Sequence, residues 1–488
     1  MSAFEELKNQ WIDPENKMFI GGEWVDALSG KTFDVTCPAN GEKLAVCASG
    51  DEQDVDRAVS AAWKAFPVWK ALSRMERSKM LGKIGRLVDE HAEMLSYTNM
   101  LEVGGLPRPF SGDIFHYYAG ACCVDEGAAN TLVNHRVSMI FDEPYGVVGQ
   151  ISAWNGPLLM ACMKIAPALA AGNCIVYRPS SHTPLGTLAL ARLAADILPP
   201  GVLNVVTGAS GTCGQAILDH PDIRKISFTG STEVGVSVAE SAARKLIPAT
   251  LELGGKSANI FFDDCNLPLA MQGFFVGAYT NAGEVCSSGS RVLVQEGIYD
   301  QFLSMAIKML ADTRVGPGWV EGAQMGSLIY ESHLKSVLDY IEIGKKEGAR
   351  VACGGYRLTE GDLAKGCFMA PTILEGDNSM RVAREEIFGP VSVFIKFKDE
   401  EEAIAIANDN VYGLAGGVFT RDLNRALRVA RGVDTGSMWV NTYSQFSPGY
   451  PFGGWKQSGM GRELHKCTMA HYTQKKSIVI NTSETQLL

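Results

Sequence analysis

Apolar and polar residues follow two different periods along the 488-residue chain. Between residues 51 and 101, apolar side chains recur at intervals of three and four, as in Val55, Ala58, Val59 and Ala62. This spacing puts them on one face of a helix and predicts two or three amphipathic surface helices. From about residue 146 the chain changes to short apolar runs bounded by turn residues, a pattern typical of strands.

Five of these runs alternate with helical stretches, which predicts a doubly wound, Rossmann-like parallel sheet. The predicted strands are residues 147–151, 174–177, 202–206, 225–228 and 249–253. The helical stretches are expected to begin near Pro157, Pro184, Gly211 and Thr232. This α/β lobe ends at Gly254-Gly255, where the glycines predict a hinge.

A second alternating series follows the two glycines and predicts a second α/β lobe. Its strands are expected at residues 258–262, 291–295, 391–397 and 437–441, separated by helical runs at 298–312, 331–347 and 400–409. Two further segments, near residues 130–145 and 477–484, have strand-forming patterns that fit neither lobe. Because such arms expose strand edges, we expect them to pair with a partner subunit.

Composition narrows the function classes. The chain is 46% hydrophobic and 20% charged, with 44 Lys and Arg against 54 Asp and Glu and a formal net charge of −10. This balance is that of a globular protein and, with no basic block in the sequence, argues against nucleic acid as the main partner. The longest apolar stretch, residues 158–177, is interrupted by Lys164 and Pro167, so we expect a buried helix and strand and no membrane segment.

The cysteines and the amino terminus indicate a reducing compartment. The twelve cysteines form neither a C-x-x-C pair nor a cluster with histidines, and the first residues lack a signal-peptide pattern. We therefore expect free thiols, a cytoplasmic location and no metal site.

Two of the candidate chemical segments are glycine-bearing. Thr229 to Gly235 links a strand to a helix, and could either bind a pyrophosphate at the helix start or simply cap the helix. Cys286 lies in the polar loop NAGEVCSSGSR at residues 281–291, whereas most cysteines are small buried hydrophobes. A nucleophile and an inert thiol both fit this setting.

Two further candidates lie at strand ends. Glu252 closes an apolar strand and could be a general base with a raised pKa, or the ion-pair partner of Lys256. Asn155 stands between a strand and a helix, where its amide could donate to an oxyanion or cap the helix.

Together these segments resemble the aldehyde dehydrogenase superfamily over nearly the whole chain. The matching stretches, in the family's order and spacing, are PYGVVGQISAWN at 144–155, KIAPALAAGN at 164–173, LPPGVLNVVTG at 198–208, HPDIRKISFTGSTEVG at 220–235, TLELGGKSANI at 250–260, GEVCSSGSR at 283–291, EEIFGPV at 385–391 and PFGGWKQSGMGRE at 451–463. The resemblance implies a homodimer or homotetramer with three parts. These are a cofactor-binding domain (1–128 and 146–254), a catalytic domain (255–465) and a β-arm oligomerisation element (129–145 and 466–488).

The resemblance also implies the oxidation of an aldehyde to a carboxylic acid with NAD or NADP. Cys286 matches the nucleophile that forms a thiohemiacetal and then a thioester. Asn155 and the backbone N–H of Cys286 match the oxyanion donors, and Glu252 matches the base that activates water for thioester hydrolysis. Lys164 and Glu463 match a supporting proton relay.

A further set of positions matches cofactor contacts, namely Ser152, Trp154, Arg178, Ser181, Gly230, Ser231, Val234, Leu253, Glu386 and Phe388. Many NAD-preferring members have Lys-Pro-x-Glu where this chain has Arg178-Pro179-Ser180-Ser181. Without that glutamate a 2′-phosphate is not repelled, and Arg178 adds a cation. We therefore hypothesise that NAD and NADP are both used.

The substrate positions depart from the family in a similar way. Gly156, Met163 and Thr280 stand where aromatic residues are frequent, and the expected remaining walls of the tunnel are Phe446, Tyr450 and Phe452. A tunnel that loses rings predicts a bulky apolar or aromatic aldehyde, although tunnel residues also vary freely. None of these segments contains an Arg or Lys that stands out as an anchor for a carboxylate or phosphate.

Glu284 stands two residues before Cys286, where Gln is common. It either raises the pKa of the Cys286 thiol or faces solvent without effect, and the solvent-facing position is favoured. Two alternatives to the hydrolytic enzyme remain open. One is a coenzyme-A-acylating relative, which generally lacks the residue that Glu252 matches. The other is a structural relative without enzymatic activity.

Overall fold

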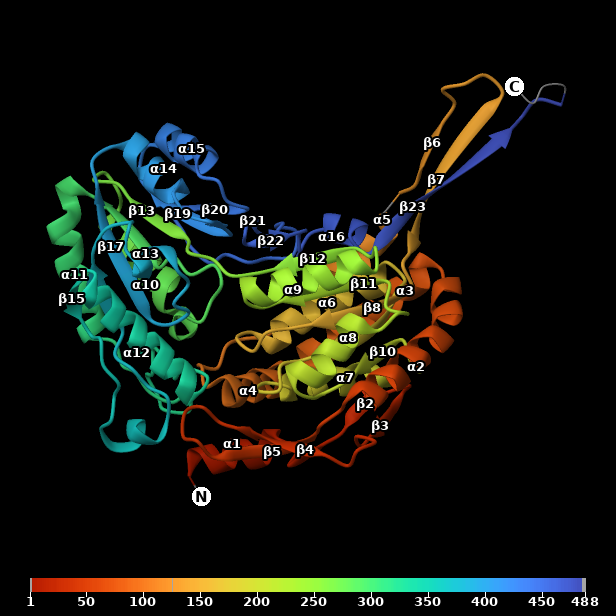
Figure 1. Cartoon of the computed structure of the whole chain (residues 1–488), viewed down its shortest axis with the longest axis horizontal. Coiled ribbons are helices and arrows are strands. Elements are labelled where there is room, and N and C mark those ends of the chain that lie inside the picture. The colour runs from red at the N-terminus through yellow and green to blue at the C-terminus, as the bar shows by residue number, and fades with distance from the viewer. Residues whose placement is uncertain (1, 125, 485–488) are drawn as a thin grey trace.

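Two α/β lobes lie side by side, and a three-stranded arm projects away from them (Figure 1). The computed structural model describes residues 2–124 and 126–484, so residues 1 and 125, and residues 485–488 of the predicted oligomerisation element, lie outside the described part. The α/β class with two wound sheets and a β-arm is confirmed.

The first lobe is built on an eight-stranded sheet with the strand order β22-β12-β11-β8-β9-β10-β2-β3. Its five central strands are those predicted from the sequence, and they run parallel: β8 Val147–Ile151, β9 Cys174–Arg178, β10 Leu203–Val205, β11 Lys225–Thr229 and β12 Ala249–Glu252. Three unpredicted strands add antiparallel pairs at the two edges: β2 Met18–Ile20, β3 Glu23–Val25 and β22 Gly459–Met460. The sheet is therefore mixed at its edges.

The second lobe has a seven-stranded sheet with the order β15-β16-β17-β14-β13-β19-β20. The four predicted strands are β13 Ala258–Phe261, β14 Arg291–Gln295, β17 Val391–Phe397 and β20 Ser437–Val440. The other three are β15 Arg350–Cys353, β16 Thr372–Glu375 and β19 Ala415–Phe419. Short strands outside the two main sheets are β1 Glu15–Asn16, β4 Thr32–Thr36, β5 Lys43–Ala48, β18 Tyr412–Gly413 and β21 Trp455–Lys456.

Helices pack around both sheets. The amphipathic stretch near the amino terminus forms three helices, α2 Glu52–Ala71, α3 Arg74–Glu90 and α4 Ala92–Val103. The remaining helices of the first lobe are α1 Ala3–Trp11, α5 Asp113–Val124, α6 Pro157–Ala170, α7 Leu185–Ala195, α8 Gln215–Asp219 and α9 Thr232–Arg244. The helices that come later in the chain are α10 Leu267–Tyr279, α11 Tyr299–Ala311, α12 Glu331–Lys346, α13 Arg381–Arg384, α14 Glu400–Asn408, α15 Leu423–Gly432 and α16 Cys467–Ala470.

The arm unites the two predicted strand-forming segments. β7 (Arg136–Pro144) pairs antiparallel with β23 (Thr473–Asn481), and β6 (Ala128–Asn130) adds a third strand. Their strand character is confirmed, and each is the other's partner within this chain. Ile478 and Val479 are exposed on β23, so the arm presents apolar surface.

Gly254 and Gly255 link the lobes through a close approach of three segments. An ideal Cβ on Gly254 would lie 2.4 Å from Glu386 Oε2, and one on Gly255 would lie 2.5 Å from the carbonyl oxygen of Cys286. Neither glycine has a left-handed backbone. These residues are therefore glycine because side chains would collide there, rather than because the chain rotates at a hinge.

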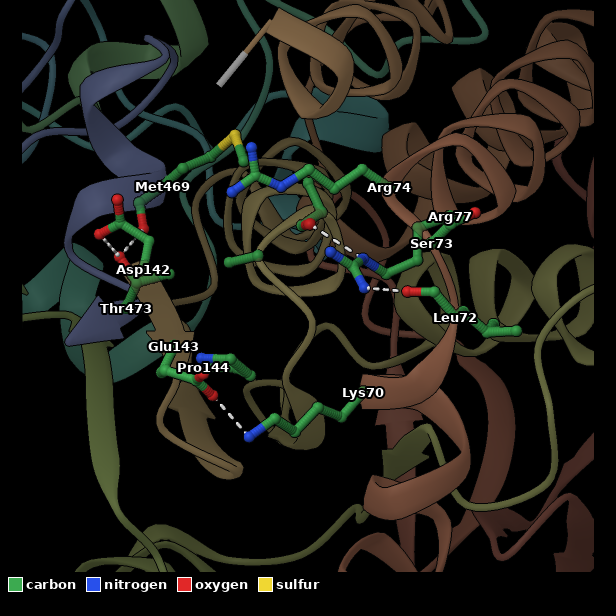
Figure 2. A pocket seen from close by; sticks show the side chains of 12 residues that line it. Lys70, Leu72, Ser73, Arg74, Arg77, Asp142, Glu143, Pro144, Met469 and Thr473 are labelled. Carbon is green, nitrogen blue, oxygen red and sulfur yellow. Dashed lines mark hydrogen bonds and ion pairs between the residues drawn. The ribbon is translucent and has the colours of Figure 1, made fainter. Parts of the chain in front are cut away.

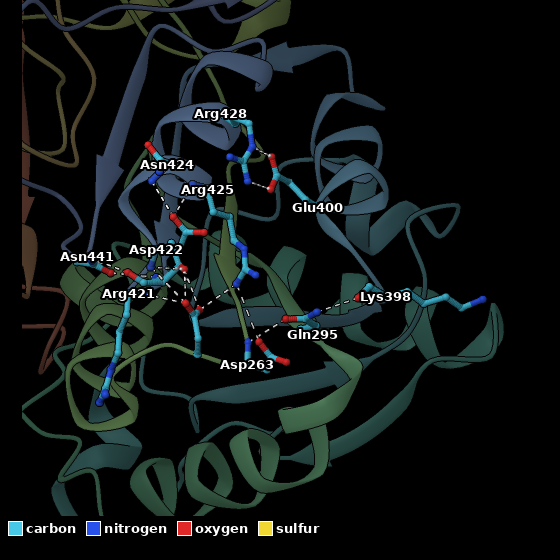
Figure 3. A network of polar contacts seen from close by, with 12 residues as sticks. Asp263, Gln295, Lys398, Glu400, Arg421, Asp422, Asn424, Arg425, Arg428 and Asn441 are labelled. Atoms are coloured by element: carbon cyan, nitrogen blue, oxygen red, sulfur yellow. Dashed lines mark hydrogen bonds and ion pairs between the residues drawn. The ribbon is translucent and has the colours of Figure 1, made fainter.

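A polar network around Asp422 and Arg425 fixes the start of α15 in the second lobe (Figure 3). The Asp264 carboxylate accepts hydrogen bonds from the Thr420 hydroxyl at 2.8 Å and from the backbone N–H of Asp422 at 3.2 Å. Arg425 Nη1 donates to the same carboxylate at 3.1 Å. Because Asp422 also caps α15, the network sets the direction in which this helix leaves the sheet.

Two expectations from the sequence concern the cellular location of the protein and its relation to membranes. All twelve cysteines are free thiols, as expected, while the cytoplasmic location stays a prediction. Within the described ranges, no helix has the length and apolar character needed to cross a membrane.

Candidate active site

The loop that carries Cys286 is held against the first lobe. It leaves α10 through a short turn in which Asn281, Ala282 and Gly283 all have positive φ, and it leads into β14. An added Cβ on Gly283 would lie 2.2 Å from the carbonyl oxygen of Gly389, so this turn also depends on glycine. The strained turn and the contact at Gly255 bring the thiol to the boundary between the lobes.

The carboxyl of Glu252 contacts that thiol. Glu252 ends β12 beside Thr229 of β11, and its side chain is buried. The Cys286 thiol donates a hydrogen bond to Glu252 Oε2 across 3.9 Å. Burial, and then the negative charge of Glu463, raise the pKa of Glu252 well above its usual range. Burial and the Glu252 charge likewise raise the pKa of Cys286. A thiol and a carboxyl whose pKa values are both raised therefore face each other.

Asn155 also contacts the loop that carries Cys286. It lies between β8 and α6, and its Nδ2 donates to the carbonyl oxygen of Glu284 at 3.0 Å. Asn281 Nδ2 donates to the Asn155 carbonyl oxygen at 3.1 Å. None of the described side chains caps α6, so Asn155 acts on the cysteine loop instead of capping the helix.

Lys164 and Glu463 form a buried ion pair near Glu252. Lys164 Nζ lies 2.6 Å from Glu463 Oε1 and also donates to the Ser227 hydroxyl at 3.2 Å. The positive charge of Lys164 opposes the effect of Glu463 on the Glu252 pKa. The alternative ion pair of Glu252 with Lys256 does not form, since the buried Lys256 ammonium has no hydrogen-bond partner among the described residues.

Cys286 lines a first cavity of about 470 Å³ whose walls are largely apolar. Of the predicted tunnel residues, Gly156, Met163, Thr280, Phe446 and Phe452 line this cavity, as do Asn155, Glu252 and Glu463. Tyr450 does not line it, and its side chain is exposed.

Cys286 also lines a second cavity, of about 480 Å³, on the other side of the loop. Nine of the ten predicted cofactor residues line it: Ser152, Trp154, Arg178, Gly230, Ser231, Val234, Leu253, Glu386 and Phe388. The tenth, Ser181, is half-buried and does not line it, whereas the neighbouring Ser180 does. Asn155 borders both cavities, so the thiol and the amide stand where the two spaces meet.

The second cavity has the features that a dinucleotide requires. Ser231 caps the 13-residue helix α9, whose first N–H groups suit a pyrophosphate. Glu386 Oε1 accepts from the Gly255 N–H at 3.0 Å, and within the described chain its Oε2 has no donor, which leaves it for a ribose hydroxyl. Burial raises the pKa of Glu386 to about 7. The rings of Trp154 and Phe388, 5.3 Å apart, supply an apolar wall for a flat heterocycle.

Glu284 corrects a sequence expectation. Its side chain is 1% exposed and does not face solvent. Its Oε1 accepts from the Ile329 N–H at 3.0 Å and lies 3.6 Å from His333 Nε2. The carboxyl is turned away from the thiol, and burial raises its own pKa well above the usual range. The contact that Glu284 makes with the site runs through its backbone carbonyl oxygen, which Asn155 binds.

Three residues of the site were missed in the sequence. Tyr330 lines the second cavity, and His333 packs against Trp154 and holds the carbonyl oxygen of Phe388 at 2.7 Å. Arg108 lines the first cavity. The only sequence signal for Arg108 was a lone basic residue in the glycine- and proline-bearing loop GGLPRPF at 104–110. Nothing local pointed to Tyr330 and His333.

Comparisons with known proteins agree with this site. A model described as "Aldehyde dehydrogenase family" matches residues 24–478. Aldehyde dehydrogenase B of Escherichia coli (strain K12) is 44% identical over 483 residues, 96% of this chain and 94% of that protein. Betaine aldehyde dehydrogenase from Staphylococcus aureus in complex with NAD+ has a TM-score of 0.96 at 36% identity, covering 100% of this chain and 99% of that chain. A mutant of an aldehyde dehydrogenase from Bacillus cereus has a TM-score of 0.95 at 39% identity, over 97% of this chain and 98% of that chain. With a thiol, a carboxyl and an amide gathered between two cavities, the chain belongs to the aldehyde dehydrogenase family of aldehyde-oxidising oxidoreductases.

Proposed function

We propose that this protein oxidises a bulky apolar or aromatic aldehyde to its carboxylic acid with NAD or NADP, through a covalent intermediate on Cys286. The observation that carries the proposal is the contact of the Cys286 thiol with Glu252 Oε2, 3.9 Å apart, where the two cavities meet. When bound in the second cavity, the nicotinamide cofactor supplies the hydride acceptor.

The first task of the protein is to ionise the thiol. Because burial keeps the proton on Cys286, a base must remove it as the aldehyde is attacked, and Glu252 is within reach. The attack places a negative charge on the aldehyde oxygen. The amide of Asn155 has a second N–H beyond the one that Glu284 accepts, and this N–H and the Cys286 N–H are the donors for that oxygen.

The second task is to release the acid. Glu252 is the base that we assign to the water that hydrolyses the thioester, and Lys164 and Glu463 bias its protonation from nearby. A coenzyme-A-acylating enzyme would not need this carboxyl, and a structural protein would need none of these groups. The presence of Glu252, Lys164 and Glu463 therefore favours a hydrolytic enzyme over both alternatives.

The overall activity is tested by following NAD(P)H formation on a panel of aldehydes. We expect benzaldehyde to be oxidised with a higher kcat/KM than acetaldehyde, because a cavity of about 470 Å³ surrounds a ring more completely than a methyl group. Turnover that requires coenzyme A would replace hydrolysis by acylation, and no turnover with any aldehyde would leave only the structural alternative.

Replacing Ser181 by glutamate should narrow the cofactor range. Ser181 does not line the second cavity, but its neighbour Ser180 does, and a glutamate is longer than a serine. A carboxylate extended toward the cavity from this position would repel the 2′-phosphate of NADP, so we expect kcat/KM for NADP to fall by about tenfold or more and that for NAD to change little. Ser181→Gln, which adds the same bulk without charge, is the matched control and should leave the NADP value near that of the wild type. A wild-type preference for NAD above about a thousandfold, roughly 4 kcal/mol, would contradict dual use.

We also propose that the chain divides into its three parts at the residues given above, and that it assembles into a homodimer or homotetramer. The arm is anchored at its base, where Lys70 Nζ of α2 lies 2.5 Å from Glu143 Oε2 of β7 (Figure 2). Beside this contact, Arg77 Nη1 ties α3 to the end of α2 by donating to the Leu72 carbonyl oxygen at 2.7 Å. Beyond this base the arm's apolar side chains have little to pack on, and such a surface suits a second subunit. Light scattering should give the mass of two or four chains; a monomer would contradict the assignment.

A further inference from the structure

Arg108 distinguishes the first cavity from a purely apolar tunnel. It lies in the loop between α4 and α5, and this loop contributes Leu106 and Phe110 to the same wall. Among the described residues that line the cavity, Arg108 is the only basic one. The loop lies about 180 residues before Cys286 and outside the motifs that mark the site. The sequence alone therefore does not predict a cation in this cavity.

Among the residues that the structure describes, the guanidinium of Arg108 has no partner. In the described chain it makes no ion pair, and no oxygen accepts a hydrogen bond from it. Arg108 is exposed and lines the cavity, and the protein around it lowers its pKa by desolvation. A cation that loses some of its hydration without gaining a partner favours an anion beside it.

The acids of the cavity do not fill this role. Glu463 is paired with Lys164 at 2.6 Å, and Glu252 contacts the Cys286 thiol. Burial favours the neutral form of Glu252. Both acids belong to the catalytic group, so Arg108 remains available to a ligand that enters the cavity.

We propose that Arg108 binds a carboxylate at the far end of the aldehyde, so that the preferred substrates carry an aldehyde, an apolar body and a carboxylate. The guanidinium fork matches a carboxylate through two parallel N–H groups. This inference rests on the proposed function and sharpens it: the apolar walls hold the body of the substrate, and Arg108 selects the sign of its charge. An aldehyde with a quaternary ammonium group is disfavoured by the same guanidinium.

The test compares 4-formylbenzoate with its uncharged methyl ester. We expect the wild type to prefer the carboxylate. Arg108→Gln should lower kcat/KM for 4-formylbenzoate by roughly 10–100-fold, mainly through KM, and change the value for the ester by less than about threefold. Arg108→Lys keeps the charge without the planar fork, so its kcat/KM for 4-formylbenzoate should lie between those of the wild type and Arg108→Gln. Arg86→Gln removes an exposed arginine from α3, outside both cavities, and should leave both values unchanged.

A second measurement needs no variant. Terephthalate, the product of 4-formylbenzoate, should inhibit the wild type more strongly than monomethyl terephthalate. Equal inhibition, equal use of the acid and the ester, or equal losses on both substrates in Arg108→Gln would overturn the role of Arg108. In each of those cases aldehydes are still oxidised, whereas failure of the proposed function itself would appear as no NAD(P)H formation with either substrate.

Discussion

The Cys286→Ala variant is expected to lose aldehyde-dependent NAD(P)H formation by a factor on the order of 10⁵ or more. No other cysteine lines either cavity among the described residues, so the variant has no sulfur with which to form the covalent intermediate. Asn155 and the cofactor residues remain, and cofactor binding, measured by fluorescence titration, should be kept. That combination separates a missing nucleophile from a misfolded protein.

Cys353→Ala is the matched control. This thiol is also half-buried, but it lies on β15 in the second lobe and lines neither cavity. We expect its activity to equal that of the wild type. More than about one part in a thousand of wild-type turnover in Cys286→Ala would contradict the assignment, because binding and oxyanion donors alone do not replace a nucleophile to that extent.

The second large effect is expected for Glu252→Gln, which should slow steady-state turnover by about 10²–10⁴-fold. Because the variant cannot activate water, the thioester accumulates. In alkaline solution, where hydroxide can take the thiol proton in place of Glu252, pre-steady-state measurements should then show a burst approaching one NAD(P)H per active site, and mass spectrometry should detect the acyl group on Cys286. Added hydroxylamine, which needs no base, should restore part of the turnover.

The pH dependence of hydrolysis gives an independent reading of Glu252. Its folded pKa is raised above the usual value, so the carboxyl is protonated in acidic solution and becomes a base only as the pH rises through that raised pKa. Thioester hydrolysis should therefore increase with pH in the wild type, and the increase should vanish in Glu252→Gln. Glu284→Gln is the control, since that carboxyl is buried against Ile329 and His333, away from the thiol. A burst in this control, or an unchanged profile in Glu252→Gln, would contradict the role of Glu252.

The fold could be predicted where apolar periodicity is strong and local. The five parallel strands of the first sheet are buried runs of apolar residues, and their limits agree with the structure to within two residues. β19 was missed because its central residues are Gly416 and Gly417. Added Cβ atoms there would lie 2.5 Å from Met438 and 2.6 Å from Tyr443, so tight packing has replaced the β-branched residues that mark a strand.

The candidate site likewise contains residues that the sequence identifies and residues that it does not. Cys286, Glu252 and Asn155 lie in short glycine-bearing motifs, so their neighbours in sequence identify them. Arg108, Tyr330 and His333 are placed by the packing of separate segments, which a single sequence does not encode locally. The prediction that the Glu284 side chain faces solvent was wrong for a related reason. Its backbone faces Asn155 while its side chain turns to Ile329, and residue type alone cannot tell which of the two acts on the site.

The position of Cys286 on the boundary of both cavities has a consequence for thiol chemistry. An alkylating reagent has two entrances to one sulfur, and a ligand in either chamber closes only one of them. Full protection of the thiol therefore requires that both chambers be filled at the same moment. With the carboxylic acid product and the oxidised cofactor as the two ligands, the rate of alkylation should report on the ternary complex without turnover.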